Sequence, residues 1–370
     1  MSKARDLAAL SNKTSLDEIN DAYVAGSLSN RNMIINGAMQ VAQRGTSATT
    51  FSYGTVDRFK PSEGSTSSLA ITQTQDTNAP SGFSNSLKIT VTTGETMSGS
   101  KQLAVFHAIE AQNLQQLGYG TSDAQSVTVS FWVKSSVTGA YCLSLYENDD
   151  NRNIGATYTI NSANTWEYKT ITFPPDTVGV IDNNNGGGLE TYFFLSVGAD
   201  RKSADNTSWA TWSAARFGYG QVADVAGTTN ATWQITGVQL EVGSVATPFE
   251  HRSYGAELAL CQRYYQQVLK SNTGFAIGVN YLNAQVHWMV DLPVEMRVKP
   301  SAIIASGSNY YIYYVNGAGK YFNNFNLESN SSTNSRVEFY DASNPTGTAG
   351  QAGMVRGINT AAKVELDAEL

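Results

Sequence analysis

The tryptophan and tyrosine side chains of this chain have the most specific chemistry. Sugar rings have apolar C–H faces that stack on aromatic rings, and their hydroxyl groups need amide, carboxylate or guanidinium partners. Trp132 is the sharpest candidate, because strand alternation places it on a polar face with Ser130 and Lys134, opposite Phe131 and Val133. A tryptophan on a polar strand face either receives a ligand or is covered by a crossing loop or a neighbouring subunit.

Other candidates for ligand contact come from a second strand and from two loops. Trp166 shares a strand face with Tyr168, and a Ser/Ala/Thr-rich segment predicted to be a loop carries further tryptophans. The segment 147–153 is dense in hydrogen-bond donors and acceptors, which fits sugar contact, a cation site or a plain solvated turn. The predicted ligand-binding residues are Trp132, Trp166, Trp209, Trp212, Tyr146, Asp149, Asp150 and Arg152.

The sequence offers little for catalysis, so we expect no enzyme. The histidines, His107, His251 and His287, lack partners at nucleophile–base or metal-ligand spacing. Phosphate-loop and nucleophile-elbow motifs are also missing. The pairs Glu241 with Glu250, or Glu110 with Asp149, keep a glycosidase open as an alternative, because two carboxylates are the usual requirement.

Composition narrows the class of protein. Charged residues make up 15% of the chain, well below the ~25% of typical globular proteins. The net charge of −7, without a basic block, argues against nucleic acid as a partner. We expect no membrane insertion, since no apolar run of about 20 residues occurs. The N-terminus has no signal-peptide core, so we expect synthesis in a cytoplasm.

The pattern of elements predicts mainly β structure in two domains. Ser15 with Glu18 forms a capping-box signature, which predicts a short helical segment within 1–30 that docks, self-associates or packs on the adjacent domain. Alternating strands with Asn/Gly-rich connections follow, and Gln102–Leu117 predicts a strand that runs into a short helical crossover. Apolar residues at helical spacing predict a linker helix at 251–268. A Tyr-rich strand at Tyr310–Val315 supplies aromatic rings to both of its faces, which suggests contact with another subunit or with a ligand.

Several blocks of sequence resemble bacteriophage tail-fibre and receptor-binding proteins that contain a carbohydrate-binding-module-like jelly roll and a C-terminal β-domain. The first block is RNMIINGAMQ, which begins at Arg31 and is followed by QRG and VDRF. The second is Ile109-Glu110, which leads to Val127–Lys134. The third runs from VQLEVG through ATPFEHR to CQRYY, and the fourth is VELDAEL at the end. The resemblance covers roughly residues 31–370.

The resemblance implies a jelly-roll β-sandwich at 31–250, the linker helix, and a smaller β-sandwich at 269–370. It implies a virion fibre protein made in the host cytoplasm, assembled as a homotrimer, joined to other virion proteins through its N-terminal segment, and attached to host-surface polysaccharide. The alternatives are a head-decoration or tail-adaptor protein without glycan binding, and a polysaccharide depolymerase. Such modules commonly hold structural Ca²⁺ where the first and last strands meet, which points to Gln40 and Glu241. Gln40 departs from the family pattern, which often has Glu there.

Overall fold

The computed structural model describes residues 31–270, 272–342 and 347–370, so the predicted N-terminal helical segment lies outside the described residues. The described chain divides into two compact units. The first contains the residues up to Gln40 together with Thr46–Arg252, and the second contains Val41–Gly45 and Ser253–Leu370. Among the described residues, no helix has both the length and the apolar character needed to cross a membrane.

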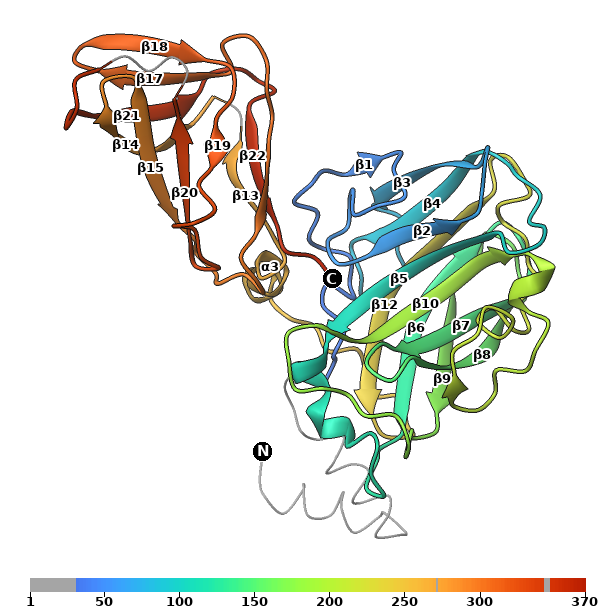
Figure 1. Ribbon diagram of the computed structural model, residues 1–370. Coiled ribbons are helices and arrows are strands. Elements are labelled where there is room, and N and C mark those ends of the chain that lie inside the picture. The colour runs from blue at the N-terminus through green and yellow to red at the C-terminus, as the bar shows by residue number, and fades with distance from the viewer. Residues whose placement is uncertain (1–30, 271, 343–346) are drawn as a thin grey trace, which may run out of the picture. The chain divides into compact units, whose positions relative to one another are not determined.

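The first unit is a jelly-roll β-sandwich of two six-stranded antiparallel sheets (Figure 1). Sheet A has the strand order β1 (Ser47–Ala48), β3 (Ala70–Asp76), β4 (Ser86–Thr93), β12 (Thr232–Val242), β6 (Val127–Ser135) and β9 (Glu167–Phe173). Sheet B has the order β11 (Ala210–Thr211), β8 (Arg152–Ile160), β7 (Gly139–Glu147), β10 (Gly187–Val197), β5 (Gln102–Glu110) and β2 (Lys60–Gly64). Short 3₁₀ turns, η1 (Ala111–Leu117) and η2 (Ala199–Arg201), follow β5 and β10.

The core of this unit lies between the inner faces of the two sheets. In strand β6, Phe131 and Val133 are fully buried in this core, whereas their neighbours on the other face are polar or only partly buried. Phe131 packs edge-on against Phe193 of the opposite sheet at a ring-centroid distance of 5.1 Å. The alternation that the sequence predicted in β6 is therefore confirmed, and it fixes which side chains of sheet A face outward.

Most strand predictions for this unit are confirmed, as is the strand-to-helix crossover at Gln102–Leu117, which forms β5 and η1. The predicted first strand is wrong. Residues 31–40 have no regular strand pairing, and the stretch 33–37 instead lies along β12, where Met33 N donates to Leu240 O and Val238 N donates to Gly37 O. Gly37 allows this close approach, because a Cβ atom there would lie 2.1 Å from Val238 O.

The second unit is a smaller β-sandwich built from a three-stranded and a seven-stranded antiparallel sheet. Sheet C has the order β13 (Tyr265–Lys270), β22 (Lys363–Asp367) and β16 (Ser301–Ile304). Sheet D has the order β18 (Ala318–Phe322), β17 (Tyr311–Val315), β21 (Ala352–Gly357), β14 (Gly274–Leu282), β15 (Gln285–Asp291), β20 (Arg336–Asp341) and β19 (Asn326–Leu327). Their inner faces share an aromatic core around Trp288.

The linker helix is shorter than predicted. Helix α3 (Tyr254–Gln262) begins at Ser253, whose hydroxyl accepts a hydrogen bond from Ala256 N at 3.3 Å. It ends at Gln262, because the chain from Tyr265 onward pairs with β22 as strand β13. The predicted helix at 251–268 is therefore corrected at its C-terminal end, where sheet pairing overrides a short helical pattern.

The segment Val41–Gly45, which the sequence pattern placed in the jelly roll, belongs to the second unit. Arg44 forms ion pairs with Asp367 and Glu369, each at 3.1 Å, and its guanidinium carbon lies 3.6 Å from the ring centroid of Tyr265. Gln43 Nε2 also donates to Tyr265 O at 2.9 Å. These contacts hold a short piece of early chain against sheet C.

Candidate functional site

The outer face of sheet A carries a hollow of about 280 Å³ whose walls are largely aromatic. Trp132 and Tyr168 occupy paired positions on the adjacent strands β6 and β9, and their ring centroids are 5.3 Å apart. Tyr168 is 45% exposed, and Trp132 is partly exposed. The complete lining of this aromatic hollow is Ser81, Gly82, Phe83, Ser130, Trp132, Tyr168, Gly237, Pro248, Phe249 and His251.

The opposite wall of the aromatic hollow comes from loops. Phe83 lies between β3 and β4, and its ring centroid is 5.0 Å from that of Phe249 and 5.3 Å from that of His251. Phe249 and His251 follow β12 and contact each other at 4.9 Å. These three rings come from distant parts of the sequence, pack against one another, and leave a recess beside Trp132.

A β-bulge in β12 shapes the floor of the hollow. The pairing register of β12 with β6 shifts between Thr236, which is opposite Trp132, and Gln239, which is opposite Ser130. Gly237 sits in this bulge with φ +62°, and a Cβ atom there would lie 2.6 Å from the Phe83 ring. Any larger residue at this position would be strained and would push the Phe83 ring away.

Polar groups extend the platform along the same sheet face. Lys134 Nζ donates to Asn78 Oδ1 at 2.5 Å and lies 5.1 Å from the Trp166 ring centroid. Trp166 Nε1 donates to the same Asn78 oxygen at 3.1 Å. Burial lowers the pKa of Lys134 from its ordinary value. Trp132 and Trp166, two of the predicted ligand-binding residues, therefore lie on one face with a fixed cation and a fixed amide.

The other predicted aromatics lie elsewhere, and they are partly buried by packing against other parts of the protein's own chain. On the outer side of sheet B, Tyr146 and Trp212 pack around Phe217, which comes from the connection between η2 and β12. Phe217 is 5% exposed. Trp209 donates from Nε1 to Pro174 O at 2.8 Å and packs against the main core. We call Tyr146, Tyr192, Phe194, Trp212 and Phe217 the packed cluster.

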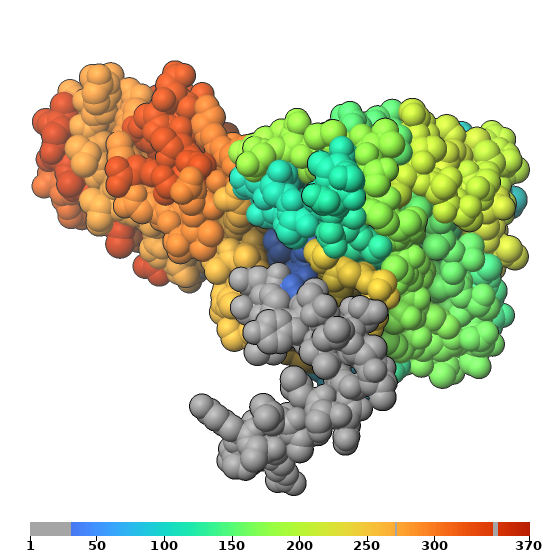
Figure 2. Space-filling view, turned by 90° about the horizontal axis from the view of Figure 1, so that it is seen from below, coloured from blue at the N-terminus to red at the C-terminus, as the bar shows by residue number. Residues whose placement is uncertain are grey.

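The predicted polar loop after β7 holds a neighbouring segment of chain. Asp149 and Asp150 accept hydrogen bonds from the backbone N–H groups of Asp182 and Val180, at 2.9 and 2.8 Å. Arg152 forms a two-pronged ion pair with Asp176 at 2.6 and 3.0 Å. Further along, backbone bonds join η1 to residues 184–186, and Figure 2 shows η1, in teal, against this lime-green connection. The acidic side chains are thus engaged in loop structure.

Glu147, which begins this loop, is fully buried. Its Oε1 accepts from Asp150 N at 3.0 Å, and its Oε2 has no hydrogen-bond partner in the part of the chain described. Burial, followed by the charges of Asp150 and Asp149, raises the pKa of Glu147 to about 7. A carboxyl group in this position holds its proton at mildly acidic pH.

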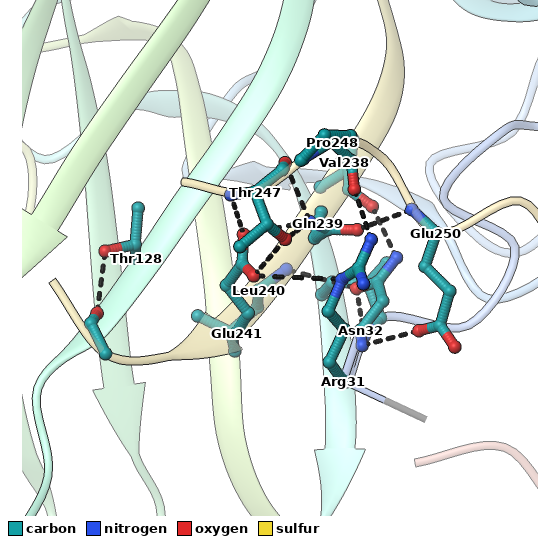
Figure 3. A network of polar contacts seen from close by, with 12 residues as sticks. Arg31, Asn32, Thr128, Val238, Gln239, Leu240, Glu241, Thr247, Pro248 and Glu250 are labelled. Carbon is teal, nitrogen blue, oxygen red and sulfur yellow. Dashed lines mark hydrogen bonds and ion pairs between the residues drawn. The ribbon is translucent and has the colours of Figure 1, made fainter. Parts of the chain in front are cut away.

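Glu241, the residue expected to hold calcium, has its carboxylate occupied by the protein (Figure 3). Oε1 accepts from Thr247 N and Gln239 Nε2 at 2.9 and 2.8 Å, and Oε2 accepts from Thr247 Oγ1 at 2.6 Å and lies 4.0 Å from Arg31 Nε. Calcium prefers six to eight oxygen ligands with several carboxylates. Within residues 31–270, 272–342 and 347–370, no group of three or more His, Cys, Asp or Glu side chains is arranged for a metal ion.

These groups do not fit a calcium ion at Glu241 as they lie. Gln40, the other expected ligand, has its backbone oxygen bonded to Gln75 Nε2 at 3.0 Å. Glu250, which the sequence offered as a catalytic partner of Glu241, accepts from Asn32 N at 2.8 Å and pairs with Arg252. Calcium binding elsewhere in the chain stays a prediction.

A second hollow, of about 420 Å³, lies in the C-terminal unit and differs in chemistry. It is lined by Met289, Asp291, Ser331, Thr333, Ser335 and Arg336. No aromatic ring lines it, so it lacks a surface for stacking a sugar. The aromatic hollow is therefore the better candidate for a carbohydrate ligand.

The sequence matches no protein-family model and no curated protein sequence. One structural neighbour is the enzymatically active domain of tailspike protein 4 of bacteriophage CBA120, 13% identical with a TM-score of 0.33 over 57% of this chain and 21% of that chain. Another is the family 11 carbohydrate-binding module of a Clostridium thermocellum cellulosomal cellulase, 11% identical with a TM-score of 0.28 over 56% of this chain and 98% of that chain. A third is a family 22 carbohydrate-binding module of the same bacterium, 12% identical with a TM-score of 0.29 over 55% and 98%. The chain thus spans about a fifth of the tailspike domain, and similarities this low assign neither family nor ligand.

Proposed function

We propose that this protein binds a host-surface glycan in the aromatic hollow and serves as a non-enzymatic fibre protein of a bacteriophage virion. The observation that carries the glycan proposal is the Trp132–Tyr168 pair, two adjacent aromatic rings that border a recess on the outer face of a sheet. An exposed aromatic platform with a few nearby polar groups is the usual arrangement of a site for a partly apolar ligand. The virion assignment is supported by the sequence blocks that resemble phage fibres.

The chemistry of the hollow favours a neutral or weakly anionic sugar chain. The faces of Trp132 and Tyr168 would stack against apolar C–H groups of sugar rings. Lys134 and Asn78 lie further along the same face and would meet hydroxyl or carboxylate groups of the next sugar. A recess of about 280 Å³ is small compared with the roughly 300–1,000 Å³ of deep ligand pockets, which suits a short segment of a polysaccharide.

Weak sites of this kind gain strength by repetition. If copies assemble as the expected homotrimer and join the particle through residues 1–30, several hollows act together. Linked sites raise the effective concentration of each site, so attachment to a polysaccharide surface becomes strong without a tight single site.

The test is Trp132→Ala, assayed by calorimetry or affinity electrophoresis against purified surface polysaccharides of candidate hosts. We expect at least a 30-fold loss of affinity, about 2 kcal/mol, as for a central aromatic contact residue. Because Trp132 is on the outer face, the melting temperature should change little. Tyr219→Ala is the matched control, since Tyr219 is also an exposed aromatic residue of this unit but does not line the hollow.

Unchanged binding by a folded Trp132→Ala variant would exclude this hollow. If the wild-type chain binds no host glycan but is captured by particles, a structural decoration or adaptor role replaces the proposal. If incubation releases reducing ends from the polysaccharide, the protein is a depolymerase instead. Repeating the melting curve with a chelator tests the calcium prediction.

A further inference from the structure

The outer face of sheet D exposes a large continuous apolar surface. On the central strand β14, Ile277 is 66% exposed and Tyr281 is 69% exposed. The apolar residues of this face, which we call the sheet D face, are Ile277, Val279, Tyr281, Met289, Tyr314, Tyr321 and Met354. They come from five neighbouring strands, β18, β17, β21, β14 and β15 (Figure 1).

The pairing register shows that these side chains form a row across the strands. Tyr314 is opposite Met354, and Met354 is opposite Ile277. Gly278 pairs with Trp288, which brings Met289 next to Ile277. Because residues paired across a sheet point to the same face, the row is continuous in space.

The Tyr-rich strand that the sequence marked as a candidate interface supplies part of this face. Tyr311 and Tyr313 point inward and are fully buried in the core. Tyr314 points the other way and is 41% exposed. One face of the strand therefore builds the unit, and the other is left for contact.

The area of the sheet D face is that of a protein–protein interface. The exposed parts of its seven apolar side chains sum to roughly 800 Å², close to the ~800 Å² that each partner contributes to a standard interface. Monomeric proteins rarely expose continuous apolar patches above a few hundred Å². In the jelly-roll unit, by contrast, exposed apolar residues such as Val178 and Val222 lie singly in loops.

The charges around the sheet D face permit contact between copies of the chain. Arg336 Nε pairs with Asp291 Oδ1 at 2.5 Å, and His287 Nδ1 lies 2.7 Å from Glu338 Oε1. Arg356, on the neighbouring strand β21, donates to Asn272. Because these groups pair within the unit, copies of this face can meet around a two-fold or three-fold axis without strong like-charge repulsion.

We infer that a second copy of this chain covers the sheet D face. The inference rests on the proposed function and names the surface through which copies of the chain assemble. It does not depend on glycan binding, which is read out separately at Trp132.

The test is sedimentation velocity on the full chain and on the double variant Ile277→Lys, Met354→Lys. We expect the wild type to sediment as a multiple of the 39.8 kDa chain and the double variant as a monomer, since two ammonium groups would be buried without partners. Val178→Lys, which adds a lysine at another exposed apolar position, should assemble like the wild type. Ile277→Val should also assemble.

A second measurement covers the case in which the double variant does not fold. Peroxide should oxidise the thioethers of Met289 and Met354 more slowly in assembled wild-type protein than after dilution. A monomeric wild type, an assembled and folded double variant, or equal oxidation rates in both states would each overturn the inference. Loss of assembly with intact glycan affinity per chain would separate this interface from the aromatic hollow.

Discussion

The two outer faces of the jelly roll carry similar residues in different surroundings. On sheet A, Trp132 and Tyr168 border an open hollow. On sheet B, Tyr146 and Trp212 surround Phe217 and belong to the packed cluster. The sequence offered both Trp132 and Trp212 as candidates, with Trp132 as the sharper one because strand alternation placed it on a polar face. The difference is that a connecting segment of the same chain covers sheet B, while the loops beside sheet A stand at the rim and leave a recess.

The comparison shows that an aromatic residue becomes a ligand platform only where the fold leaves it uncovered. Rings of the packed cluster pack against one another, as in the pair Tyr192–Phe217, whose ring centroids are 4.7 Å apart. Rings of the aromatic hollow also contact one another, but they border a recess, and Tyr168 is 45% exposed. Covered rings should therefore control stability, and open rings should control binding.

Removing a ring of the packed cluster should have the largest effect on stability. Phe217→Ala deletes a buried side chain that contacts Tyr192, Phe194 and Trp212. We expect the free energy of unfolding to fall by about 3 kcal/mol, as for other buried Phe-to-Ala changes. Urea denaturation followed by intrinsic fluorescence measures it. Glycan affinity per folded chain should equal that of the wild type, and a parallel loss would mean that sheet B also binds the ligand.

The pH dependence of stability should reveal that the loop beside sheet B is structural. Burial raises the pKa of Glu147 to about 7, above the ordinary value of 4.5, so the folded chain holds a proton that the unfolded chain loses. This contribution to stability is complete below the ordinary pKa and is lost as pH rises through about 7. Glu147→Gln should therefore be more stable than the wild type by about 1–2 kcal/mol at pH 8 and nearly equal to it at pH 4.

Melting curves at several pH values test this prediction. Glu63→Gln, which makes the same substitution at an exposed glutamate of the same unit, is the control variant. A Glu147→Gln variant that is less stable at pH 8 would show that the charged carboxylate has a favourable partner. If instead glycan binding alone responded to this substitution, the loop would belong to the ligand site, as the sequence first suggested.

The smallest expected effect comes from the hydroxyl group of Tyr168. Tyr168→Phe keeps the ring beside Trp132 and removes one hydrogen-bonding group from an exposed position. We expect affinity to fall by a factor of about 2 to 5, which corresponds to roughly 0.5–1 kcal/mol for one neutral hydrogen bond. Calorimetry with the glycan whose binding Trp132→Ala weakens measures this loss of affinity. An effect as large as that of Trp132→Ala would make the hydroxyl, rather than stacking, the main contact.

Local pattern alone determined much of the fold. The alternation in Val127–Lys134 correctly placed Phe131 inside and Trp132 outside, because a strand of any sheet turns successive side chains to opposite faces. The hairpin at Asn316-Gly317 was also readable, since both residues adopt the positive φ that favours Asn and Gly in tight turns.

Other features depend on long-range tertiary contacts, which a local sequence pattern does not encode. The hollow depends on Phe83, Phe249 and the bulge at Gly237, which the sequence analysis missed because these residues are far from Trp132 along the chain. Helix α3 ends early because the residues after it pair with β22. Val41–Gly45 joins the second unit because Arg44 forms its ion pairs there. In both cases the partners lie more than 90 positions away along the chain. The sequence by itself determined which side chains face outward from a regular strand such as β6. Only the packing of distant segments decided which of those side chains stay uncovered, because burial depends on long-range contacts.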